Sequence, residues 1–76
     1  MNHVILPELG ESIEKATVAC WHAGPGQKVA ADDEIVEVVT DKATFNVPAG
    51  HEGVIKEILV EEGKEVPIGT KLAAIE

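Results

Sequence analysis

The chain has 76 residues, which allows one domain, and 45% of them are hydrophobic, which is enough to form a core. Its formal net charge of −8 argues against proteins that bind nucleic acids or anionic membrane surfaces, because both partners require a basic face. Cys20 is the only cysteine, so no disulfide can form within the chain. So small a chain has little room for a deep substrate pocket, which argues against an enzyme acting alone.

In chain order, short segments rich in valine, isoleucine and threonine alternate with turn signals. Residues 35–40 and 43–48 are predicted strands joined through Asp41 and Lys42. Residues 54–60 are a further predicted strand, with a change of phase near Lys56 and Glu57 of the kind that a β-bulge produces. The pattern predicts an all-β domain of roughly seven or eight short strands, packed as a flattened barrel or sandwich of two short antiparallel sheets.

The chain also repeats weakly with an offset of 37 residues. The offset aligns Gly26 with Gly63, and apolar pairs fall in the same register: Val18 with Ile55, Trp21 with Ile58, Ala23 with Val60, Val29 with Val66, Ala31 with Ile68, Ile35 with Leu72, Val36 with Ala73, and Val38 with Ile75. We expect two halves related by an approximate twofold axis. The same offset relates the turn at Lys42 to the place where the chain ends meet, so both termini are expected at the pole opposite Lys42.

The apolar positions of these segments predict the core. Trp21 is included as a core residue rather than as a platform for a cofactor, because it falls in register with Ile58. The predicted core residues are Val18, Trp21, Val29, Ile35, Val38, Val47, Ile55, Ile58, Val66, Leu72 and Ile75.

Lys42 is the candidate functional residue because of its position. A lysine in a turn is most often only a solvated side chain. Here, however, a tight hairpin between strands of matched length would project the side chain clear of the body and fix its direction. A catalytic amine needs burial or positive neighbours, whereas Asp41 and Glu37 bring negative charge close to Lys42 in the sequence. The pattern therefore favours a target of covalent modification.

Motifs at characteristic positions extend over almost the whole chain. They comprise residues 6–12 (LPELGES), 16–18 (ATV) with Trp21, 26–29 (GQKV), 37–43 (EVVTDKA), 47–49 (VPA), 53–55 (GVI), 62–66 (EGKEV), 69–72 (GTKL) and Ile75. In this order and spacing the sequence resembles the lipoyl domains, which are the carrier modules of the acyltransferase components of 2-oxo acid dehydrogenase complexes. The resemblance implies a single domain over residues 1–76, excised from a longer acyltransferase chain, with the lipoyl-lysine at a hairpin tip.

By this resemblance, Lys42 accepts lipoic acid in amide linkage from a lipoate ligase and becomes a swinging arm. A thiamine-diphosphate-dependent 2-oxo acid dehydrogenase component would load acyl groups onto the arm, and the acyltransferase catalytic core would remove them. A dihydrolipoyl dehydrogenase would then reoxidise the arm. The domain itself would be a non-catalytic, monomeric carrier, located in a bacterial or archaeal cytoplasm or, as a mature fragment, in the mitochondrial matrix.

The neighbours of Lys42 bear on which cofactor it takes. Asp41 and Ala43 match the residues that flank the target lysine in lipoyl domains, whereas biotinyl carriers typically have methionine on both sides. The resemblance also implies that a loop near the lysine helps the dehydrogenase component to choose its partner; its residues here are Glu8, Leu9, Gly10, Glu11, Ser12, Ile13, Glu14 and Lys15. A biotinyl carrier domain and a protein-binding β module with an unmodified Lys42 remain the alternatives.

No metal site is expected from the sequence. His3, His22 and His51 lack the paired spacing of metal ligands, and no calcium-binding loop with its glycine follows Asp32. Cys20 is interpreted as a small hydrophobic residue or a quiet surface thiol.

Overall fold

The computed structural model describes residues 2–10 and 12–76, and within those ranges the regular structure consists of strands alone. The strands are β1 (Asn2–Ile5), β2 (Lys15–Trp21), β3 (Lys28–Val29), β4 (Glu34–Val39), β5 (Thr44–Pro48), β6 (Gly53–Ile58), β7 (Glu65–Pro67) and β8 (Lys71–Ile75). The all-β prediction is confirmed, and β4, β5 and β6 lie within two residues of the three predicted strands. No described residue belongs to a helix long and apolar enough to cross a membrane.

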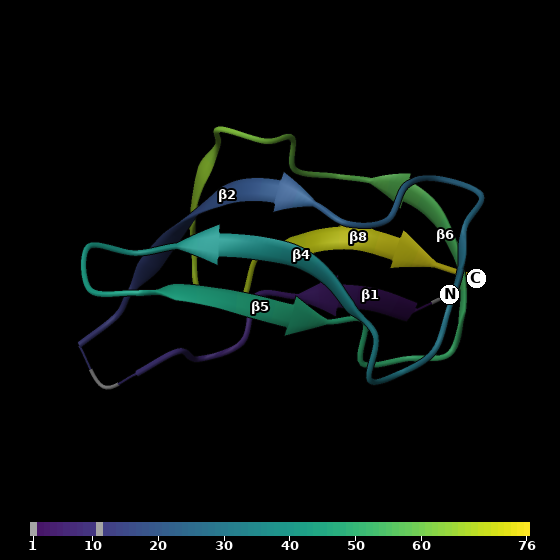
Figure 1. Cartoon of the computed structure of the whole chain (residues 1–76), viewed down its shortest axis with the longest axis horizontal. Coiled ribbons are helices and arrows are strands. Elements are labelled where there is room, and N and C mark those ends of the chain that lie inside the picture. The colour runs from purple at the N-terminus through teal and green to yellow at the C-terminus, as the bar shows by residue number, and fades with distance from the viewer. Residues whose placement is uncertain (1, 11) are drawn as a thin grey trace.

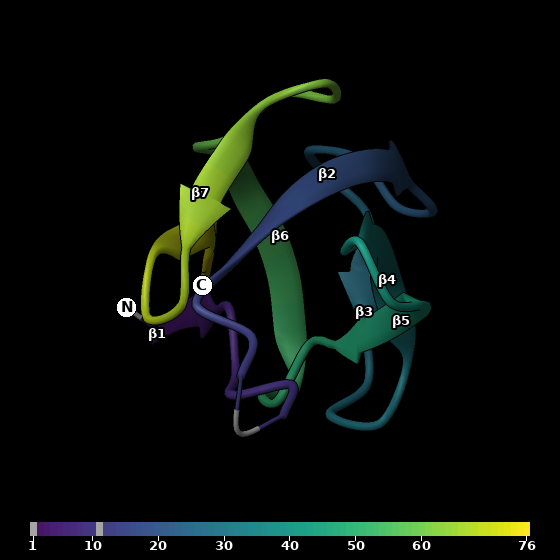
Figure 2. The same ribbon diagram turned by 90° about the vertical axis from the view of Figure 1, so that its left-hand side faces the viewer.

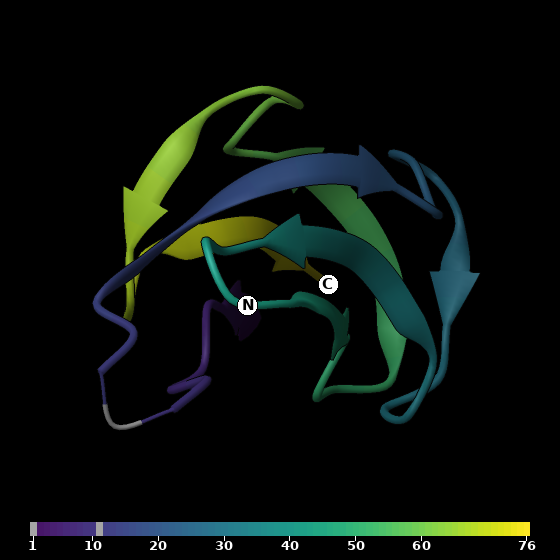
Figure 3. The same ribbon diagram turned by 60° about the vertical axis from the view of Figure 1, so that its left-hand side comes forward.

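The strands form two four-stranded antiparallel sheets with the orders β1-β8-β6-β3 and β5-β4-β2-β7. The views in Figures 2 and 3 show the two sheets curving around a shared interior, as in a flattened barrel. The molecule measures 32 × 21 × 17 Å. Its long axis runs roughly along the strands of the β4–β5 hairpin (Figure 1).

The 37-residue repeat is a repeat of structure. Adding 37 converts the pair Val18↔Val38, between β2 and β4, into Ile55↔Ile75, between β6 and β8. Both pairings also shift register at the corresponding place, after Val18 in β2 and after Ile55 in β6, which confirms the predicted change of phase in β6. Turn hydrogen bonds follow the same rule: Gly26 N–H donates to Ile55 C=O and Gly63 N–H to Val18 C=O, each at 2.7 Å.

Most of the predicted core is confirmed, but three of its members lie at its margin. Trp21, Ile58 and Val66 are half-buried and pack against the buried cluster. Trp21 and Ile58 are the last residues of their strands, and Val66 lies on the edge strand β7. The Trp21 indole N–H donates to Val60 C=O at 2.9 Å, so the polar end of the ring stays satisfied at this margin.

Other core residues break the simple alternation of a half-buried strand. Val36 and Ala73 are completely buried although their neighbours Ile35 and Leu72 are buried as well. The β4–β5 and β8–β1 pairings each shift register at this point, so consecutive side chains both turn inward. The full set of buried apolar residues is Val4, Leu6, Ala16, Val18, Ala23, Val29, Ile35, Val36, Val38, Val47, Ala49, Ile55, Val60, Leu72, Ala73, Ala74 and Ile75.

The two chain ends lie together at the pole opposite the β4–β5 turn, as predicted (Figure 1). The C-terminal residue is held by reciprocal bonds: Val54 N–H donates to Glu76 C=O at 3.0 Å, and Glu76 N–H donates to Val54 C=O at 2.9 Å. Gly53 permits this approach, because a Cβ atom there would lie 2.5 Å from the Glu76 carbonyl oxygen. A tether attached at the ends therefore leaves the Lys42 pole unobstructed.

Candidate functional site

The β4–β5 turn is built by its own first residue. Thr40 N–H and the Thr40 hydroxyl both donate to Ala43 C=O, at 2.8 and 3.1 Å. The hydroxyl oxygen in turn accepts the N–H groups of Lys42 at 3.2 Å and Ala43 at 3.1 Å. No described non-glycine residue has a positive φ, so this turn is not of the type I′ kind. Hydrogen bonds of the Thr40 hydroxyl hold the turn closed, in place of the backbone conformation of a type I′ turn.

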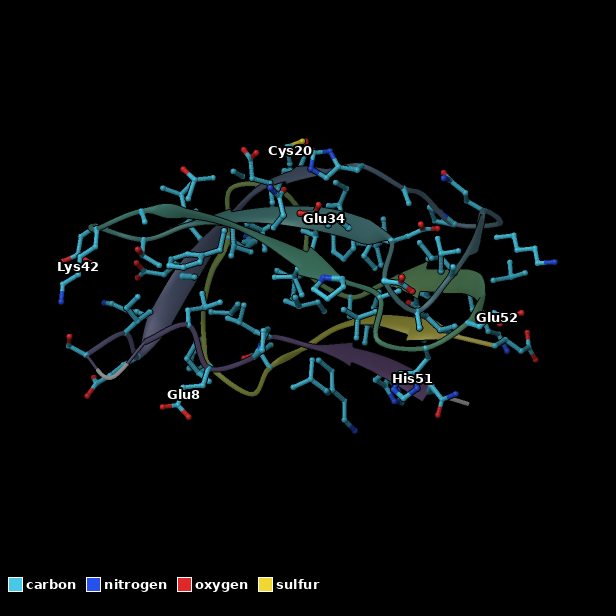
Figure 4. The ribbon with its side chains drawn as sticks, turned by 60° about the horizontal axis from the view of Figure 1, so that its bottom comes forward. Glu8, Cys20, Glu34, Lys42, His51 and Glu52 are labelled. Carbon is cyan, nitrogen blue, oxygen red and sulfur yellow. The ribbon has the colours of Figure 1, made fainter. Side chains whose placement is uncertain are left out.

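Lys42 is exposed at the apex of this turn, between the exposed residues Asp41 and Ala43, as the sequence predicted (Figure 4). Its Nζ donates to the hydroxyl oxygen of Ser12 at 2.7 Å, and this contact joins residues 30 positions apart in the sequence. The amine is therefore accessible to solvent and at the same time directed toward the β1–β2 loop.

The predicted recognition segment divides into parts with different roles in the fold. Ser12 reaches Lys42, and Ile13 N–H closes the preceding turn by donating to Gly10 C=O at 3.2 Å. Leu9 packs against the core, and Glu8 is exposed on the loop, away from Lys42 (Figure 4).

The end of the same segment is fastened to β7 and to the turn that follows it. Glu14 C=O accepts the N–H of Ile68 at 2.9 Å, and Lys15 Nζ lies 3.3 Å from Glu65 Oε1. Glu11 lies outside the described residues. Ser12 is therefore the described member of the segment whose side chain contacts Lys42.

A groove of about 380 Å³ opens between the start of β2 and the end of β4. Ile13, Ala16 and Val39 contribute apolar atoms to it. Ser12, which contacts Lys42, and Asp41, which precedes Lys42 in the chain, also line the groove. The described residues that line it are Ser12, Ile13, Glu14, Lys15, Ala16, Thr17, Val39, Thr40, Asp41 and Glu65.

Sequence reasoning missed Thr40 as part of the site. Its signal was available, because serine and threonine side chains commonly bond nearby backbone groups at turns. The contact between Ser12 and Lys42 left no local signal, since it depends on where the β1–β2 loop lies relative to the β4–β5 turn.

The other candidate residues form no comparable site. Among the described residues, no three histidine, cysteine, aspartate or glutamate side chains are grouped as metal ligands. Cys20 is half-buried, with its Sγ 3.7 Å from Nδ1 of His22, and His22 Nε2 lies 3.2 Å from Asn46 Oδ1.

The described geometry can be compared with known proteins. The sequence profile of a family described as "Biotin-requiring enzyme" (Biotin_lipoyl) matches residues 2–75. The chain therefore belongs to the biotin- and lipoyl-attachment family. Within that family its likeness is to lipoyl domains: the solution structure of the lipoyl domain of the 2-oxoglutarate dehydrogenase complex from Azotobacter vinelandii superimposes with a TM-score of 0.76 at 39% identity, over 100% of this chain and 96% of that one.

Curated relatives point to the same class of domain. The lipoamide acyltransferase component of the branched-chain α-keto acid dehydrogenase complex from Bacillus subtilis is 38% identical over 76 residues, all of this chain and 18% of its own length. The dihydrolipoyllysine-residue succinyltransferase component of the 2-oxoglutarate dehydrogenase complex from Escherichia coli K12 is 43% identical over 63 residues, 83% of this chain and 16% of its own. The chain thus spans less than a fifth of the length of either relative.

Proposed function

We propose that this chain is a lipoyl carrier domain in which Lys42 holds lipoic acid in amide linkage. The observation that carries the proposal is the exposed Lys42 amine at the apex of a hydrogen-bonded hairpin, at the pole opposite both termini. Membership of the family and the likeness to a lipoyl domain support the same assignment. Asp41 and Ala43 are proposed to flank the lysine as recognition residues for the ligase.

The attachment chemistry needs only an accessible amine and an activated donor. A lipoate ligase would supply the lipoyl group as an acyl donor carrying a leaving group on its carboxyl carbon. The deprotonated Nζ of Lys42 attacks that carbon, the amide C–N bond forms, the leaving group departs, and the nitrogen releases a further proton to solvent. The loss of one positive charge changes the formal net charge from −8 to −9, so the domain stays strongly acidic.

The fold then determines how the cofactor is presented. Once attached, lipoic acid supplies a redox-active disulfide that can carry acyl groups. The turn closed by Thr40 holds the attachment point, and the tether at the opposite pole leaves the tip free to visit successive active sites. Tethering of this kind raises the effective concentration of the carrier at each active site.

We further propose that the domain is one part of a longer acyltransferase chain, since it spans less than a fifth of the relatives described above. Its partners would be a thiamine-diphosphate-dependent 2-oxo acid dehydrogenase component, an acyltransferase core and a dihydrolipoyl dehydrogenase. The exposed side of the β1–β2 loop beside Lys42 is the proposed surface for the first of these partners.

The decisive experiment is modification of the purified domain by a lipoate ligase, followed by peptide mass analysis. A lipoyl group confined to Lys42 is the expected result. The matched control is the double variant Asp41→Lys with Lys42→Asp, which keeps composition and charge but moves the lysine by one position; it should remain unmodified. Biotinylation by a biotin ligase would favour the biotinyl carrier instead, and no modification by either enzyme would favour an unmodified binding module.

The acyl group served by the domain is identified by a second assay. Lipoylated domain is offered to pyruvate, 2-oxoglutarate and branched-chain dehydrogenase components, and the rate of reductive acylation is compared. The component with the highest kcat/KM identifies the parent complex.

A further inference from the structure

The side chain of Lys42 has a defined direction at the hairpin tip. Its Nζ donates to Ser12 Oγ at 2.7 Å, and Figure 4 shows the side chain turned from the hairpin toward the β1–β2 loop. An unbranched lysine without such a partner would sample many rotamers in water. The Ser12 hydroxyl thus selects the rotamers that lead toward the loop.

The groove described above begins where this side chain ends. Ser12 is both the partner of Lys42 Nζ and part of the groove lining, so the amine lies at the mouth of the groove. The volume of about 380 Å³ is within the range of pockets that hold small ligands. Ile13 and Val39 both contribute apolar atoms to the lining, and Val39 is 38% exposed.

We propose that this groove is a resting site for the lipoyl arm and that Ser12 is the residue that directs the arm into it. The inference rests on the proposed lipoylation of Lys42. After amide formation Nζ keeps one N–H group, which can still donate to Ser12 Oγ. The remainder of the arm then leaves the nitrogen toward Ile13 and Val39, where its hydrocarbon chain loses contact with water.

The charges around the groove fit a neutral occupant. Among the described lining residues, Glu14, Asp41 and Glu65 contribute carboxylates, and the ammonium group of Lys15 is paired with Glu65 at 3.3 Å. These carboxylates do not repel an uncharged lipoyl arm, whereas they repel an arm that bears a carboxylate.

The expected occupancy is modest, which suits a mobile carrier. A single hydrogen bond of this kind shifts a conformational equilibrium by about two- to twelvefold. The arm is therefore held between encounters and released when a partner's active site offers stronger contacts.

NMR spectroscopy of the loaded domain tests the proposal. Domain labelled with ¹⁵N and ¹³C is lipoylated, and loading at Lys42 is confirmed by mass analysis. A domain with acetyl-lysine at position 42 serves as the reference, because it has lost the positive charge of Lys42 but lacks the lipoyl arm. We expect NOEs between the arm and the Ile13 and Val39 methyl groups, and amide shift changes at Ala16 and Thr17 that acetylation does not produce. Absence of these signals in fully lipoylated protein would overturn the resting site, whereas failure to load would count against the proposed function itself.

Variants separate the role of Ser12 from general effects on the fold. Ser12→Ala should weaken the NOEs about two- to twelvefold, and Ser12→Thr, which keeps a hydroxyl, should restore them. Val39→Glu should abolish them, whereas Val54→Glu should not, because Val54 is equally exposed, at 39%, but does not line the groove. Unchanged NOEs in Ser12→Ala would refute its positioning role, and equal effects of the two valine variants would refute the groove.

Discussion

Replacing Thr40 by valine isolates the hydrogen bonds that shape the hairpin tip, because valine keeps the β-branched outline and removes the hydroxyl. The variant loses two acceptor bonds, from the N–H groups of Lys42 and Ala43, and one donor bond to Ala43 C=O. All three are exposed, so water replaces them in part and each contributes at the low end of about 0.5–1.5 kcal/mol. The sum of about 1.5 kcal/mol shifts the equilibrium between the closed and the open turn roughly tenfold toward the open form.

The assay is the initial rate of lipoylation by a lipoate ligase at limiting domain concentration, measured beside a urea denaturation curve. We expect kcat/KM to fall about tenfold for Thr40→Val if the ligase recognises the closed turn. The matched control is Thr70→Val, which removes a single turn hydrogen bond, from the Thr70 hydroxyl to Pro67 C=O at 2.7 Å, in the β7–β8 turn. Wild-type rates for Thr40→Val would show that the closed geometry of the tip is irrelevant to recognition.

Three further predictions concern the scaffold. Gly53→Ala should destabilise the domain by about 2–4 kcal/mol in urea titrations, since its Cβ would meet the Glu76 carbonyl oxygen at 2.5 Å. Gly50→Ala, at φ 77° and with open space around it, should cost about 1 kcal/mol. Equal costs for the two variants would contradict the steric explanation. Trp21→Ala should cost about 2–4 kcal/mol, because the half-buried ring loses packing and its bond to Val60 C=O, and thermal unfolding measures this. Lys42→Ala should leave the melting temperature unchanged and abolish lipoylation; a loss of stability as large as that of Trp21→Ala would mean that the tip is part of the scaffold.

Local patterns in the sequence predicted most of the architecture. Alternating apolar residues and turn signals predicted β4, β5 and β6 nearly to their ends, because strand pairing requires one buried face and turns require particular residues. The 37-residue repeat predicted the twofold relation and the position of the termini, and the matching turns at Gly26 and Gly63 have the same φ of 88°. The position of Lys42 at the hairpin apex followed from the same local rules.

Alternation failed where the sheets bend. Ile35 and Val36 are both buried, as are Leu72 and Ala73, since a register shift turns consecutive side chains toward the interior. Trp21 was expected in the core because it falls in register with Ile58, but at the end of β2 it is only half-buried against the core.

The amino-acid sequence alone thus determined that this chain forms short paired strands and that Lys42 lies at the apex of one hairpin. Only the tertiary structure decided what Lys42 touches. Ser12 lies 30 residues away, and its contact with Nζ arises because the loop that leads from β1 in one sheet to β2 in the other approaches the β4–β5 turn. Strand pairing and turn formation are governed by neighbouring residues, whereas the approach of one loop to another depends on how the two sheets close around the core.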